Sequence, residues 1–73
     1  MNREMVRQHL EQAERHVSEG ERHIARQREI VAEPKGAGRI YQAAIDLLAQ
    51  FENMQASHIA DRDRLRKELA SSR

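Results

Sequence analysis

Residues 9–29 read HLEQAER HVSEGER HIARQRE, three copies of a seven-residue unit that begins with histidine each time, and a fourth copy starts at 30–33 as IVAE. A period of seven is typical of a helix that packs along a coiled-coil seam. Its positions a and d hold Leu10, Val17, Ile24 and Val31, and Val6, Ala13, Gly20 and Gln27. The repeat therefore predicts a long helix with a narrow apolar stripe, in which large side chains alternate with very small ones.

The two ends of this helix are marked in the sequence. Asn2 is a good N-cap, and Met1 and Val6 stand where a hydrophobic staple would place them. Pro34 ends the helix, because it lacks an N–H and pushes the residue before it out of the α region. In the segment PKGAG, Gly36 suits a left-handed cap and Gly38 a permissive N-cap for a second helix.

This second helix is also amphipathic. Its series of a- and d-like positions alternates spacings of three and four: Tyr41, Ala44, Leu48, Phe51, Gln55, His58, Arg62, Leu65 and Leu69. The short connection makes the two helices fold back on each other. We expect one all-α helical-hairpin domain over residues 1–73, with helices at about 3–32 and 39–70 and a turn at 33–38.

The two helices differ in apolar width. Between Ile40 and Ile59 the apolar arc of the second helix covers about half of its circumference, which one partner helix cannot cover. We therefore expect a homodimer, with two hairpins forming a four-helix bundle about a two-fold axis. The side chains expected at that interface are Tyr41, Ile45, Leu48, Phe51, Gln55 and Ile59. Most large apolar residues lie near the turn, so we expect the terminal half to fray first.

Composition restricts the classes of function. The chain has 73 residues and no cysteine, which excludes disulfides and thiolate metal sites and leaves self-association to support a small core. A net charge of +1 provides no field that attracts nucleic acid or an anionic membrane. Without an apolar leader or a membrane-length apolar run, we expect a cytoplasmic protein with no membrane partner.

The histidines invite a metal-binding interpretation. His9, His16 and His23 are seven residues apart, about 10.5 Å along a helix, so no two of them can share an ion. His58 is expected to meet His16 across the hairpin, but no third or fourth ligand is evident. We therefore expect no metal and no cofactor. Histidine changes charge near neutral pH, so this lane predicts an assembly that weakens below about pH 6.

Gly20 costs about 1 kcal/mol in a helix relative to alanine. Two explanations are open: close approach of the second helix, opposite a large residue such as Phe51 or Met54, or a tolerated defect. Substitution by alanine would stabilise the chain in the second case only.

Arginines gather at one end of the expected hairpin, at Arg3, Arg7, Arg62 and Arg66. Acidic residues are interleaved with most of the basic ones, which favours a solvated, ion-paired surface. Binding of nucleic acid is therefore disfavoured, although a dimer would double this patch. For catalysis, no serine has an activating His/Asp arrangement and no glycine-rich phosphate loop occurs, so we expect no enzyme.

The heptads at 9–27, together with ASHIADRDRL at 56–65, resemble a group of short uncharacterised bacterial proteins with the same helix–turn–helix layout. The resemblance covers most of the chain except 34–41. The group has no established activity, so the resemblance implies a fold and no chemistry. The sequence favours a non-enzymatic interaction or structural module that self-associates. The alternatives are a small DNA-associated regulator and a histidine-based metal-binding protein.

Overall fold

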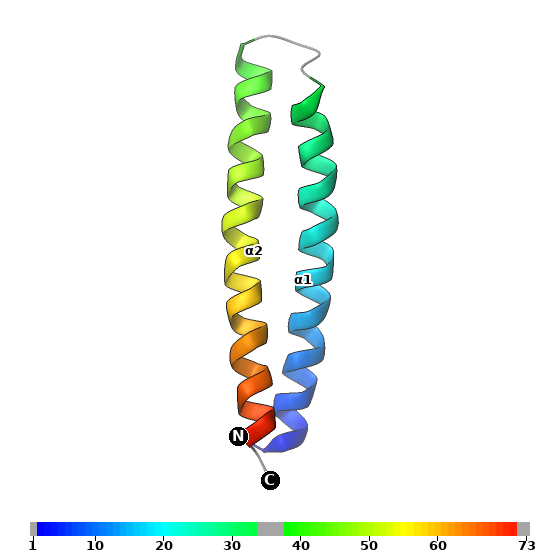
Figure 1. Ribbon diagram of the computed structural model, residues 1–73, viewed down its shortest axis with the longest axis vertical. Helices are drawn as coiled ribbons and strands as arrows, with labels where there is room; N and C mark the ends of the chain where they lie inside the picture. The colour runs from blue at the N-terminus through cyan, green and yellow to red at the C-terminus, as the bar shows by residue number, and fades with distance from the viewer. Residues whose placement is uncertain (1, 34–37, 72–73) are drawn as a thin grey trace.

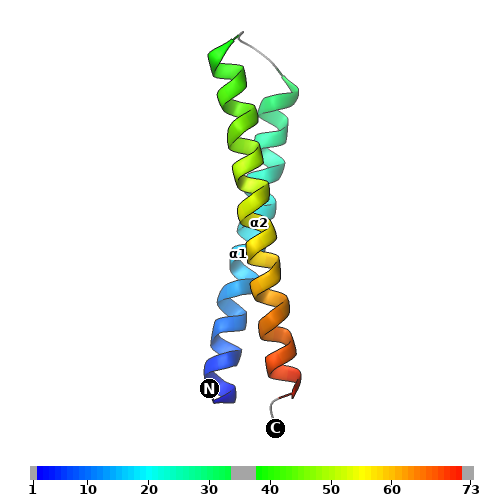
Figure 2. The ribbon, with the colours of Figure 1, turned by 90° about the vertical axis from the view of Figure 1, so that its left-hand side faces the viewer.

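The computed structural model describes residues 2–33 and 38–71, which form two helices, α1 (Arg3–Ala32) and α2 (Arg39–Ser71). They lie antiparallel and side by side along a rod of 56 × 14 × 13 Å (Figure 1), and they cross at a shallow angle (Figure 2). The all-α helical hairpin predicted from the sequence is confirmed. The helix bounds differ from the expected ones only at the last residue of α2.

The start of α1 is capped by Asn2. Its side-chain Oδ1 accepts a hydrogen bond from the Met5 amide at 2.8 Å, and its carbonyl accepts the first helical bond, from Val6. The bond from Met5 satisfies one of the amides that a helix start leaves without partners. The expected staple involves Met1, which lies outside the described residues.

The residues on either side of the turn, Glu33 and Gly38, have the backbone conformations that their sequence positions favour. Glu33, which precedes proline, has left the α region with φ −116° and ψ 81°. Gly38 has a φ of +76°, a conformation that favours glycine, and its carbonyl accepts from Gln42 at 3.0 Å. Gly38 is thus the N-cap of α2. The roles predicted for Pro34 and Gly36 lie outside the described residues.

The heptad pattern matches the pattern of burial. All eight a and d residues of α1 between Val6 and Val31 are buried or half-buried, and so are all nine of the α2 series between Tyr41 and Leu69. The side chains at these positions therefore form the seam between the helices. In α1 the buried ones are Val6, Ala13, Val17 and Gln27, and in α2 they are Gln55 and Leu65.

The distribution of burial along the rod is the reverse of the expected one. The buried cluster of Val6, Ala13 and Leu65, with Leu10 and Leu69 packed on it, lies in the terminal half. Of the large apolar residues near the turn, Ile30, Ile40, Leu47 and Met54 are exposed, and the others are half-buried. The expectation that the terminal half frays first rested on a count of apolar residues, whereas the structure places the fully buried apolar residues in that half. The order in which the two halves fray stays a prediction.

The outer surface is charged. Arg7 pairs with Glu4 and Glu11 at 2.6 Å, and its hydrogen bond holds the pKa of the Glu4 carboxyl below the usual value. Exposed pairs of this kind add little stability and mainly keep the helix solvated. In the described part of the chain, neither helix contains a segment long and apolar enough to cross a membrane.

Candidate functional site

The two sides of the helix–helix seam have different chemistry. On one side, ion pairs join the helices: Arg28 with Glu52 at 3.3 Å and Arg66 with Glu14 at 3.2 Å. These four residues occupy the heptad position that follows a by four residues in each helix. We call this side the salt-bridged face. Ile45 and Ile59 occupy the same position in α2 and belong to it.

The opposite side is occupied by the residues that precede position a. In α1 these are His9, His16, His23 and Ile30, and in α2 they are Ile40, Leu47, Met54, Asp61 and Glu68. We call this side the open face, because no ion pair found among the described residues joins the helices across it. Its apolar members are exposed: Ile40 is 78% exposed, Met54 51% and Ile30 42%. The open face is therefore apolar near the turn and polar toward the termini.

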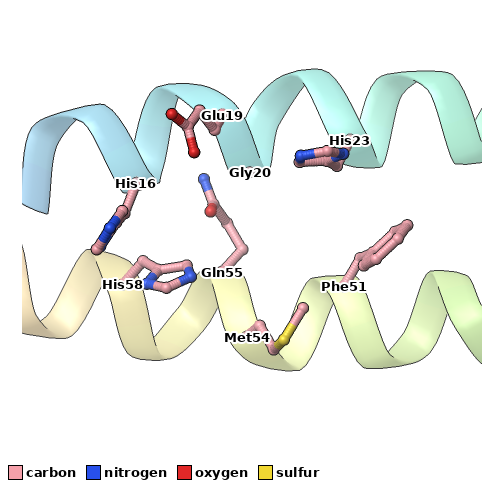
Figure 3. A pocket seen from close by; sticks show the side chains of 8 residues that line it. All are labelled: His16, Glu19, Gly20, His23, Phe51, Met54, Gln55 and His58. Carbon is pink, nitrogen blue, oxygen red and sulfur yellow. The ribbon is translucent and has the colours of Figure 1, made fainter.

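A hollow lies on the open face at the middle of the rod. Four residues of each helix line it: His16, Glu19, Gly20, His23, Phe51, Met54, Gln55 and His58 (Figure 3). Its volume is about 260 Å³, and it is open to solvent on one side. The hollow exists because Gly20 leaves the d position of α1 without a side chain at this level.

Gln55 forms the floor of this mid-rod hollow. Its side chain crosses from α2 toward α1, and Nε2 donates to the Val17 carbonyl at 2.9 Å. A β-carbon on Gly20 would clash with Oε1 and would lie 2.7 Å from Cδ. Gly20 is therefore needed for close approach, as one of the two explanations supposed, although the residue it admits is Gln55 and not Phe51 or Met54.

Only one of the two polar atoms of the Gln55 carboxamide has a hydrogen-bond partner. Gln55 is 6% exposed, and its Oε1 is the single buried side-chain polar atom without a hydrogen-bond partner in the described segments. Oε1 instead lies along the direction of a Cα–H bond of Gly20, a weak contact that recurs where helices approach closely. Gln27 makes the reciprocal link, donating to the Ala44 carbonyl at 2.9 Å. Each helix thus sends one buried glutamine to the backbone of the other.

The histidines separate into different environments. His16 and His58 meet across the seam with ring centroids 5.2 Å apart, the meeting that the register predicted. His23 lies on Phe51, with ring centroids 5.7 Å apart. His9 and His23 are exposed and His16 and His58 are half-buried, so the four residues expected to form a pH-sensitive lane do not share one environment.

The six residues expected at a dimer interface also fall into two groups. Tyr41, Leu48, Phe51 and Gln55 lie along the seam, where Gln55 bonds to α1 of its own chain. Ile45 and Ile59 lie on the salt-bridged face. The more exposed apolar residues of α2 are Ile40, Leu47 and Met54 on the open face, which were not among the six.

The arginine patch at the terminal end is engaged in local contacts. Arg3 donates to the Leu69 carbonyl, Arg62 pairs with Asp63, and Arg66 pairs with Glu14 on the other helix. Arg7 carries two acidic partners of its own helix. The patch therefore consists of guanidinium groups that already have carboxylate or carbonyl partners.

Within residues 2–33 and 38–71, no group of three or more His, Asp or Glu side chains is placed to hold a metal ion. Sequence reasoning did not identify the glutamine pair, although a polar residue at a seam position is a recognisable signal. Gln27 was assigned to position d, and Gln55 was interpreted as part of an interface.

No protein-family model matches the chain, and neither the curated proteins nor the solved structures gave a match.

Substitution of Gly20 by alanine tests the close approach. Helix propensity alone predicts a gain of about 1 kcal/mol. We expect instead a loss of about 1–3 kcal/mol in the free energy of unfolding, because the new β-carbon displaces the Gln55 carboxamide from Val17. Urea denaturation measures the free energy of unfolding of the unmodified chain and of the variant. In a Gln55→Ala background the same substitution should be neutral or stabilising, and an equal effect in both backgrounds would contradict the assignment.

Proposed function

We propose that this chain is a non-enzymatic self-association module in which a second copy covers the open face. The observation that carries the proposal is the asymmetry of the hairpin. One side of the seam is closed by interhelical ion pairs, and the other exposes Ile30, Ile40, Leu47 and Met54 in the half near the turn. A contiguous apolar patch rimmed by polar groups is the usual mark of an interaction site.

The surface area of the hairpin supports a partner of its own size. Its accessible surface is 5623 Å², whereas a compact monomer of 8.5 kDa has about 4,700 Å². The excess is close to the roughly 800 Å² that each partner buries in a standard interface. A rod 56 Å long and 14 Å wide presents about that area on one face. One copy of this chain is therefore sufficient to cover the open face.

The open face changes from apolar near the turn to polar toward the termini, and this change favours one orientation of the second copy. With the two-fold axis along the rod and the turns at the same end, α1 of one copy lies against α2 of the other. Ile30 then faces the partner's Leu47, and His16 faces the partner's Asp61. With the rods opposed, Leu47 instead faces the acidic region near the partner's Asp61. We propose the turn-to-turn arrangement, because it brings the apolar halves of the two open faces together.

The other functional classes have less support. The arginines that a DNA-associated regulator would use already pair with acidic groups or carbonyls, and their neighbours include Glu4, Glu11 and Asp63. Association through apolar helix faces needs no catalytic residue and no cofactor. A reducing compartment such as the cytoplasm suits a chain without cysteine.

Two exposed apolar residues of α2 provide a matched test of the interface. Leu47 is 39% exposed on the open face, and Ile59 is 36% exposed on the salt-bridged face. We expect Leu47→Lys to weaken the dimer at least tenfold, because it places a charge in the apolar contact, and Ile59→Lys to leave it unchanged. Sedimentation equilibrium measures the dissociation constants. A monomeric unmodified chain, or equal effects of the two variants, would contradict the proposal.

The orientation is tested with a spin label, for which the absence of cysteine makes single labelling straightforward. Gln42 is exposed near the start of α2, about 20 Å from the middle of the rod. In the turn-to-turn dimer, two labels at Gln42→Cys lie at the same level, within about 30 Å of each other. In the opposed dimer they are separated by about 40 Å along the axis alone. Pulsed electron paramagnetic resonance measures the distance between the two labels. A distance above 40 Å would exclude the turn-to-turn arrangement but would leave self-association itself intact.

The pH dependence is expected to reside mainly in His23. This imidazole lies on Phe51, beside Met54 in the hollow, with Glu19 and Arg26 on its own helix and His58 from α2. Protonation places a charge where the second copy docks, and burying that charge is unfavourable. We expect a dimer at pH 8 that dissociates toward pH 5, and a His23→Leu dimer that persists at both. His9→Gln is the control and should keep the pH dependence. An unmodified dimer at pH 5 would refute this expectation.

A further inference from the structure

Two imidazoles from different helices meet at one end of the mid-rod hollow. The centroids of His16 and His58 are 5.2 Å apart, and their planes are inclined by 49°. When two imidazoles share a tetrahedral ion with bonds of about 2.0–2.1 Å, their ring centroids lie about 5 Å apart. The observed separation of the ring centroids therefore matches that of two imidazoles bound to a single ion.

The same hollow contains a buried acceptor without a donor. Oε1 of Gln55 has no hydrogen-bond partner, and Gln55 lies one helical turn from His58 on α2. Leaving such an oxygen unpaired costs about 1–3 kcal/mol. A cation in the hollow would lower that cost through its electric field, although Oε1 itself faces Gly20 and does not reach the ion.

The charge of the hollow also favours a cation. Its lining includes the carboxylate of Glu19 and contains no lysine or arginine, although the chain has 13 of these residues. Figure 3 shows His16 and His58 on the same side of Gln55, with Glu19 above Gly20. An ion between the two imidazoles would thus lie in a hollow whose lining includes one carboxylate and no lysine or arginine.

We propose that His16 and His58 form a site for a divalent transition-metal ion of the copper, nickel or zinc type. Imidazole nitrogens suit these ions. Water completes the coordination, so the ion remains accessible from the open side of the hollow. Because the ligands come from both helices, the bound ion links α1 to α2 near the middle of the rod. The site is complete within one chain and does not depend on the proposed dimer.

Cu²⁺ is the probe that tests the site, because it binds imidazole most strongly among these ions and has an electron paramagnetic resonance spectrum. The experiment uses full-length protein without a histidine tag at neutral pH. We expect one Cu²⁺ per chain, with hyperfine splitting from two nitrogens and an increase in thermal stability. His16→Gln and His58→Gln should each weaken binding at least tenfold. A spectrum with fewer than two nitrogens would overturn the proposal.

Two further variants separate this site from general binding by histidine. His9→Gln removes an exposed imidazole of the same lane and should leave the affinity unchanged, whereas an equal loss would show non-specific binding. Gln55→Glu places a negative charge in the hollow and should raise the affinity about tenfold. Unchanged or weaker binding in this variant, with the helix content intact by circular dichroism, would show that the ion does not bind in the hollow.

Discussion

The hairpin depends on the placement of one carboxamide. Gln55 occupies a seam position of α2, reaches the Val17 carbonyl of α1, and fits only because Gly20 has no side chain. A helical carbonyl has a second lone pair, so it accepts this bond without losing its own helical partner. A slip of one helix along the other would bury both ends of the carboxamide without partners, which is costly. The bond therefore fixes the register, and with it the pairing of Glu14 with Arg66 and of His16 with His58.

The fixed register divides the molecule into two unlike faces. On the salt-bridged face, long charged side chains reach across the seam and cover it. On the open face, the corresponding positions hold histidines and apolar residues that do not reach across, and Gly20 leaves a gap beneath them. The proposed self-association and the proposed metal site both use the side that the hairpin does not close. They overlap at the hollow, because a second copy that covers the open face also covers His16 and His23.

Much of this structure could be predicted from the sequence. The heptads predicted the seam, because a seven-residue period places the same side chains against a neighbour turn after turn, and Asn2 and Gly38 predicted the helix starts. Register also predicted that His16 meets His58. The role of Gln55 was missed because periodicity shows that a residue lies at a seam but not which neighbour its polar atoms find. The expected interface left out Ile40, Leu47 and Met54 for a related reason, since a count of apolar residues does not show on which side of the seam they lie.

The ends of the described chain lie together, with Arg3 bound to the Leu69 carbonyl at the opposite extremity from the turn (Figure 1). A pair of such hairpins aligned in the same sense would have unlike poles. The Arg3 and Ser71 ends of the helices would lie at one pole, and the Ala32 and Arg39 ends would lie at the other. Proteins joined to the same terminus of the two copies would then be held close together at one pole. Such a dimer would bring its attached proteins together on one side and would not hold them apart at opposite ends.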